Sequence, residues 1–159
     1  MLEVMLFGKK TQEKCGNILK KQIPASLAAG KNYGNLPSSL LRQIARRDEF
    51  ILLHRPEPEE YWCIFDASQE GVTRMAQRNH LRTLTCGFSP YDTLVLSGMS
   101  LDQAVVSLQR EIHTVSDRLL EPGDYVIHCS GASDDPALLL CTATLLMSDR
   151  DRDNHVFYF

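Results

Sequence analysis

Residues 61–96, YWCIFDASQEGVTRMAQRNHLRTLTCGFSPYDTLVL, constrain the fold more than any other part of the chain. An apolar run ends at Asp66, and a helical pattern with Val72, Met75 and Ala76 on its inward face follows over 69–79. A second apolar run ends at Gly87. This order predicts a parallel strand–helix–strand unit. In open parallel sheets ligands bind beyond the carboxyl ends of the strands, so we expect a ligand site just after Asp66 and around Gly87.

The preceding residues predict two further strand–helix cycles. Residues 2–7 are an apolar strand candidate, followed by a helical segment that can begin at Thr11. The string LPSSLLRQIARRD, at 36–48, is a helix candidate from Pro37 onward. It leads into the apolar strand candidate at 49–55. PEPEE at 56–60 is expected to be an exposed turn.

The pattern changes after Gly87. DTLVLSGMS, QAVVSLQREIHTVS and DYVIHC are strand-like runs without intervening helices, which is typical of antiparallel strands. ASDDPALLLCTATLLMSD then predicts a deeply buried helix, with Ser133, Asp134 or Asp135 as its cap and Pro136 in its first turn.

Together these patterns predict a single α/β domain over 1–159, with a mainly parallel, Rossmann-like sheet and flanking helices. Residues 1–90 are expected to form the parallel units and 91–130 a small antiparallel extension. Residues 131–159 are expected to form the buried helix and a C-terminal strand or tail. A chain of 159 residues is long enough to bury one core without metal or disulfide crosslinks.

Composition excludes several classes of function. The formal net charge is −3 and the basic pairs are scattered, so we expect no nucleic-acid partner. No apolar run approaches the roughly 20 residues that cross a bilayer, and the first ten residues do not resemble a signal peptide, so a cytoplasmic location without a membrane partner is expected. The five cysteines are widely spaced, as is typical of buried thiols in a reducing compartment, although reactivity at Cys86 or Cys129 stays open.

Motifs that suggest catalysis are incomplete. In HCSGASDD, at 128–135, the position that would need a phosphate-binding arginine holds Asp135, which argues against a cysteine phosphatase. AAGKNYGN, at 28–35, lacks the first glycine and the hydroxyl residue of a phosphate loop. DRDRDN, at 149–154, lacks the glycine and the distal glutamate of a calcium loop, and the histidines do not pair at metal-binding spacing. No metal and no cofactor are expected.

Residues from Ile64 to the end of the buried helix resemble the second half of the central domain of Mur ligases, the ATP-dependent amino-acid-adding enzymes of peptidoglycan synthesis. FDASQ, EGVTRMAQRN, LTCGFSPYDT and VVSLQREI are similar to successive elements of that domain, and GASDDPALLLCTATLL is similar to its Gly-x-His-Asn turn and alanine-rich helix. Ser133 and Asp134 stand where the family has its nucleotide-contacting His and Asn. The family's phosphate loop and magnesium glutamate region are missing.

The resemblance implies a stand-alone, degenerate nucleotide-binding domain that acts as a non-catalytic binding or regulatory module. The alternative is a subunit of an ATP-dependent amide ligase whose phosphate loop comes from a partner chain. The partner is then a protein or a small ligand, a homo-oligomer stays open, and a link to the cell wall is expected. Asp66 can either contact a ligand or cap the following helix. The candidate ligand-binding residues are Asp66, Ser68, Gly87, Ser89, Ser133 and Asp134, and no catalytic residue is expected.

Overall fold

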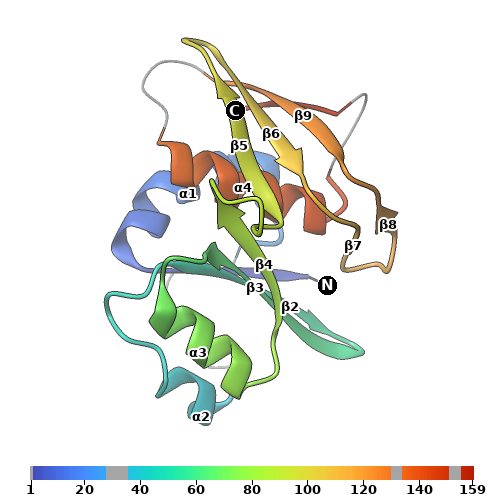
Figure 1. The fold of residues 1–159 in the computed structure, drawn as a ribbon. Coiled ribbons are helices and arrows are strands. Elements are labelled where there is room, and N and C mark those ends of the chain that lie inside the picture. Colours follow the sequence, from blue (N-terminus) through green and yellow to red (C-terminus); the bar gives the residue numbers. More distant parts are fainter. Residues whose placement is uncertain (1, 28–35, 130–133, 151–154) are drawn as a thin grey trace. The chain divides into compact units, whose positions relative to one another are not determined.

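The computed structural model describes residues 2–27, 36–129, 134–150 and 155–159. The chain forms two compact units, Met1–Thr83 and Leu84–Phe159, and each combines helices with strands (Figure 1). The α/β class is therefore confirmed, with both parallel and antiparallel strand pairs. Several expectations fall outside the described residues: the loop at 28–35, residues 130–133 of the string at 128–135, which include Ser133, and residues 151–154 of the string at 149–154.

Besides the start of β4 (Arg82–Gly87) at its boundary, the described residues of unit 1 form three paired strands and three helices. These are β1 (Glu3–Phe7), α1 (Lys9–Gln22), α2 (Ser38–Leu41), β2 (Phe50–Pro56), β3 (Glu59–Asp66) and α3 (Glu70–Arg78). β2 lies between β1 and β3, and both pairings are antiparallel. The expectation of parallel strands is wrong here. Only Glu57 and Pro58 separate β2 from β3, and so short a connection can join antiparallel neighbours but not parallel ones.

The helix expected over 37–48 is shorter than the sequence predicts. α2 ends at Leu41, and the residues that follow form turns. The Asp48 carboxylate accepts a hydrogen bond from the backbone N–H of Ala45 at 2.8 Å, which gives the chain a local alternative to helical hydrogen bonding. The connection to β2 is therefore irregular, and it carries Arg47 and Asp48 on its last turn.

The core of unit 1 follows from the central position of β2. Residues 50–54 are all buried because both faces of this strand are covered, which explains its unbroken apolar sequence. Phe50 stacks on Phe7 with ring centroids 4.5 Å apart. Val72, Met75 and Ala76 pack the inner side of α3 against this core, as the sequence predicts. α2 and α3 lie side by side (Figure 1), joined by hydrogen bonds between the amide groups of Gln43 and Asn79.

Trp62, the single tryptophan of the chain, is buried on β3 with 3% of its surface exposed. The guanidinium groups of Arg55 and Arg82 lie over its ring, 5.2 and 5.8 Å from the centroid. Glu60 joins both arginines, with N–O distances of 2.7 and 2.8 Å. Trp62 fluorescence therefore reports on the packing of unit 1.

Unit 2 contains a mixed sheet and one long helix. Its elements are β4 (Arg82–Gly87, which begins at the boundary), β5 (Leu94–Met99), β6 (Gln103–Leu108), β7 (Ile112–His113), β8 (Leu119–Leu120), β9 (Gly123–His128), α4 (Asp135–Met147) and β10 (Val156–Tyr158). The strand order is β4-β5-β6-β9-β10. The pairs β5–β6 and β6–β9 are antiparallel, whereas β4–β5 and β9–β10 are parallel. The antiparallel extension is thus confirmed, and the C-terminal segment is a strand.

α4 is the buried helix that the sequence predicts. Every residue from Ala137 to Met147 is buried, and the helix packs against β5. Of the three possible caps Asp134 fills the role, because its carboxylate accepts the N–H of Ala137 at 3.1 Å. Pro136 lies in the first turn, where a missing N–H breaks no helical hydrogen bond.

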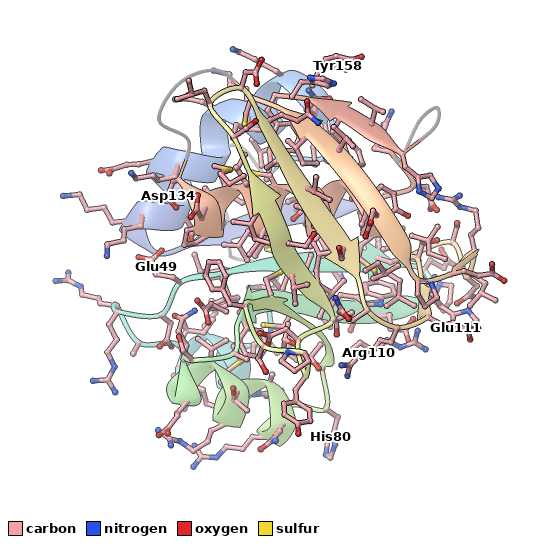
Figure 2. The ribbon with its side chains drawn as sticks, turned by 45° about the horizontal axis from the view of Figure 1, so that its top comes forward. Glu49, His80, Arg110, Glu111, Asp134 and Tyr158 are labelled. Carbon is pink, nitrogen blue, oxygen red and sulfur yellow. The ribbon has the colours of Figure 1, made fainter. Side chains whose placement is uncertain are left out.

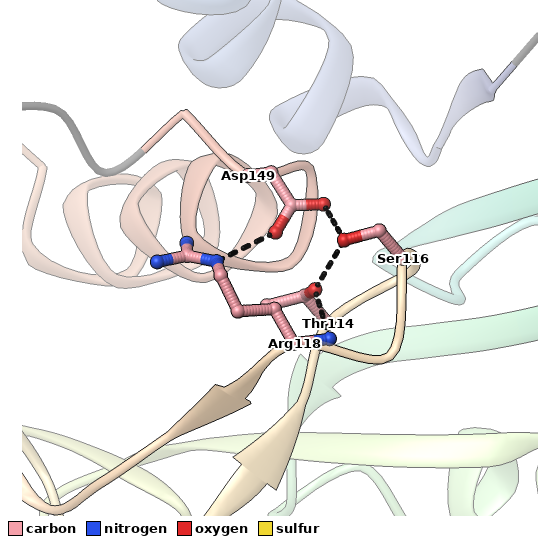
Figure 3. A network of polar contacts seen from close by, with 4 residues as sticks. All are labelled: Thr114, Ser116, Arg118 and Asp149. Carbon is pink, nitrogen blue, oxygen red and sulfur yellow. Dashed lines mark hydrogen bonds and ion pairs between the residues drawn. The ribbon is translucent and has the colours of Figure 1, made fainter.

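A polar network ties the residue after the C-terminal cap of α4 to the β7–β8 hairpin (Figure 3). The Asp149 carboxylate accepts hydrogen bonds from the Ser116 hydroxyl at 2.7 Å and from Arg118 Nε at 3.1 Å, and Ser116 in turn contacts the Thr114 hydroxyl at 3.1 Å. Burial of Asp149 opposes its ionisation, but hydrogen bonds from Ser116, Thr114 and Arg118 together hold its pKa below the ordinary value. The folded state therefore favours the ionised carboxylate.

This lowered pKa predicts a pH dependence of stability. A carboxylate with a lowered pKa stabilises the fold at pH values above about 3.9, the pKa in the unfolded chain, and this contribution disappears as the pH falls through the lower folded pKa. We expect Asp149→Asn to lower the free energy of unfolding by about 1 kcal/mol at pH 7 and to have little effect near pH 2. Urea denaturation at several pH values checks this. Asp117→Asn, in the same hairpin, serves as the control, and an equal loss at both pH values contradicts the assignment.

Candidate functional site

A cavity of about 350 Å³ lies at the amino-terminal end of α3, within unit 1. Its lining comes from the turn before β2, from the segment that joins β3 to α3 and from the start of α3: Arg47, Asp48, Ser68, Gln69, Glu70, Gly71 and Arg74. The sequence places a site after Asp66, and the structure puts the cavity beside that segment. The sequence does not predict that the turn before β2 lines the cavity, because Arg47 and Asp48 belong to the helix expected over 37–48.

The β3–α3 connection is shaped by two side chains. The Asp66 carboxylate accepts the N–H of Ser68 at 2.9 Å, which closes a tight turn at the end of β3. Gln69, not Asp66, is the N-terminal cap residue of α3, and it forms no side-chain capping bond. The expectation that Asp66 caps this helix is therefore wrong, because the helix begins too far along the chain for its side chain to serve the first turn.

The Gln69 side chain instead connects the two segments that line the cavity by hydrogen bonds. Its side-chain amide accepts the N–H of Glu49 at 2.9 Å and donates to the carbonyl of Glu49 at 2.7 Å. This pair of bonds imitates one step of a β-ladder and fixes the residue next to Asp48. The two segments that line the cavity are thereby held together by hydrogen bonds.

The charged groups of the cavity are of both signs. Arg47, Glu70 and Arg74 are exposed, and Arg74 Nη1 lies 3.8 Å from Glu70 Oε2. Asp48 is different, since only 6% of it is exposed. Below it in the core, burial first and the Asp48 charge second raise the pKa of the Cys63 thiol far above its ordinary value. Cys63 is therefore a protonated core residue and not a nucleophile.

The amino-terminal end of α1 is occupied by a side chain of the protein itself. The Glu49 carboxylate lies beside this first turn (Figure 2), where it accepts the N–H of Lys10 at 3.2 Å, the N–H of Thr11 at 2.8 Å and the Thr11 hydroxyl at 2.7 Å. The cap residue is Gly8, so the expectation that Thr11 begins the helix is wrong. An internal carboxylate thus fills the position at which a helix terminus could hold a phosphate.

In unit 2, the Asp92 side chain contacts both Gly87 and Ser89. This buried carboxylate accepts the N–H of Ser89 at 3.1 Å and packs directly against Gly87. Arg110, labelled in Figure 2, donates to the carbonyl of Tyr91 at 2.8 Å in the same turn. Both predicted ligand residues therefore have structural roles, as does Asp134, the cap of α4.

The predicted site residues fall into separate groups. Asp66 and Ser68 lie together in unit 1, whereas Gly87, Ser89 and Asp134 belong to unit 2. A ligand site that combines the two groups stays a prediction. Of the five candidates that the structure describes, only Ser68 lines the cavity.

The imidazole of His54 lies in the interior of unit 1. It is buried on β2 and stacks on Tyr61 with ring centroids 4.5 Å apart, but neither ring nitrogen has a hydrogen-bond partner among the described residues. Glu59 and Glu3 approach the two nitrogens to 3.4 and 4.0 Å. Burial first, then the charges of Glu59 and Glu3, raise the pKa of the Tyr61 hydroxyl.

Within the described parts of the chain, no group of three or more His, Cys, Asp or Glu side chains is arranged to hold a metal ion. All five cysteines are buried thiols, as predicted. None of the described helices has both the length and the apolar character needed to cross a membrane. Comparisons with protein-family models, curated proteins and solved structures found no match.

Proposed function

We propose that this chain is a Mur-ligase-like module without a phosphate loop, which binds a small ligand and performs no ligase chemistry on its own. The observation that carries the binding role is the cavity at the start of α3, where two arginines and a buried carboxylate converge on an open space of about 350 Å³. The order of sequence features from Ile64 to the end of α4 supports the Mur-like part of the proposal.

The environment of α1 supports the absence of ATP chemistry. A phosphate at this helix terminus would have to displace Glu49, whose carboxylate already accepts three hydrogen bonds there. The negative charge of Glu49 also opposes a second anion at the same place. Transfer of a phosphoryl group needs lysine and magnesium positions that neutralise developing charge, and the sequence has no phosphate loop to supply them.

Isothermal titration calorimetry with ATP and Mg²⁺ tests this proposal. We expect no binding heat beyond that of Mg²⁺ alone, because the sequence has no phosphate loop and Glu49 occupies the amino-terminal end of α1. A dissociation constant in the micromolar range, equivalent to about −8 kcal/mol, would overturn the proposal. Purification of the full chain with a stable partner and ATPase activity would instead favour a ligase subunit.

A further inference from the structure

We propose that the cavity at the start of α3 binds a small zwitterion, with an ammonium group directed at Asp48 and an oxyanion directed at Arg47 and Arg74. The inference rests on the binding role proposed above and names the class of ligand. It is carried by three charged side chains from two segments of unit 1.

Asp48 supplies the first half of the site. It is more than nine-tenths buried, and its Oδ2 accepts the N–H of Ala45 at 2.8 Å. Among the described residues, no hydrogen bond reaches its second oxygen, Oδ1. Oδ1 lies 3.5 Å from the position that a Cβ atom of residue 71 would occupy. It therefore faces the part of the cavity lining where Gly71 has no side chain. A carboxylate oxygen that faces the cavity without an internal donor in the described parts of the chain can accept a hydrogen bond from a ligand that donates to it.

Arg47 and Arg74 supply the second half. Both residues line the same cavity, from the turn before β2 and from α3, and planar guanidinium groups suit carboxylates and other oxyanions. The exposed contact between Arg74 and Glu70, at 3.8 Å, is long and weak and does not occupy the arginine. The Ser68 hydroxyl and the first turn of α3, which has no side-chain cap, add further donors to an oxyanion.

The balance of charge selects a ligand with both signs. Two arginines face one buried and one exposed carboxylate, so the lining carries no formal net charge. A simple anion would be repelled by Asp48 and Glu70, and a simple cation by the arginines, whereas a zwitterion pairs with both. The volume of about 350 Å³ is at the small end of ligand pockets, which limits the ligand to a small molecule.

The experiment is a ¹⁵N NMR titration of the full chain with glycine, whose oxyanion is a carboxylate, and with taurine, whose oxyanion is a sulfonate. Acetate and methylammonium serve as compounds with a single charge. We expect saturable shifts of the amides from Gln69 to Arg74 with the zwitterions, and at least tenfold weaker binding of the other two. No saturable shift with either zwitterion at about 100 mM, well above a millimolar dissociation constant, overturns the inference. Equal binding of acetate or methylammonium also overturns it.

Three variants sharpen the test. Gly71→Ala places a methyl group at ordinary contact distance over Oδ1 of Asp48, so we expect at least tenfold weaker zwitterion binding, although alanine favours the helix. Arg74→Gln should weaken binding by a similar factor. Arg78→Gln, on the same helix but outside the cavity, should change it less than twofold. Unchanged affinity of Gly71→Ala contradicts the site.

The two proposals fail in different ways. Absence of zwitterion binding overturns only the ligand class, provided that MgATP also produces no heat. MgATP binding overturns the proposed function, whatever the zwitterions do.

Discussion

Gly8→Ala is expected to lower the free energy of unfolding of unit 1 by about 3 kcal/mol or more. Gly8 has a φ angle of 96°, a conformation that side chains rarely adopt. An added Cβ would also lie 2.6 Å from the carbonyl oxygen of Asp48 and collide with the Glu49 carboxylate. Backbone strain and displacement of the Glu49 carboxylate from the start of α1 therefore both lower the free energy of unfolding. Urea denaturation followed by Trp62 fluorescence measures the loss.

Gly16→Ala is the matched control, since Gly16 lies inside α1 and its nearest neighbour to an added Cβ is Leu6 at 3.8 Å. There the substitution should stabilise unit 1 by up to about 1 kcal/mol, because alanine favours a helix. The double variant Gly8→Ala/Glu49→Ala should not recover stability, as the φ angle and the Asp48 carbonyl remain. Recovery in the double variant would show that the side-chain collision alone is responsible.

Gly87→Ala is expected to destabilise unit 2 by about 2–3 kcal/mol. An added Cβ would lie 3.1 Å from Cγ of Asp92 and collide with its carboxylate. Asp92 is 7% exposed and accepts the N–H of Ser89, so it cannot turn away without losing that hydrogen bond inside the protein. Hydrogen exchange of the α4 amides reports the stability of this unit.

A double-mutant cycle isolates the contact between Gly87 and Asp92. In an Asp92→Ala background, Gly87→Ala should cost less than about 0.5 kcal/mol, because the carboxylate is gone. Gly98→Ala on β5 is the control, since its added Cβ would meet Val105 at an ordinary 3.7 Å. If Gly87→Ala is equally costly in both backgrounds, then its effect does not arise from Asp92.

The elements predicted best are those whose signals are local. α4 was predicted with its possible caps and its Pro136 in the first turn, because a wholly apolar run of this length must be covered on every side. The inward residues of α3 were also predicted, from helical spacing alone. Neither prediction depends on where distant strands lie.

The candidate site was predicted less well, and the reason is physical. The segment after Asp66 borders the cavity, but Arg47 and Asp48 carry no signal in the sequence that distinguishes them from solvent-exposed residues of a helix. Their role depends on the turn that Asp48 closes with Ala45 and on the bonds from Gln69 to Glu49 across 20 positions of sequence. Such long-range pairs have no periodicity to reveal them.

The sequence by itself determined which segments become strands and helices over most of the chain, because burial patterns and helix caps act between near neighbours. Only the tertiary structure decided the direction of the strands in unit 1, since an apolar run suits either pairing and the two-residue β2–β3 connection makes it antiparallel. It also decided that Glu49 caps α1 and that Asp48 faces a cavity, because both depend on side chains brought together from distant parts of the chain.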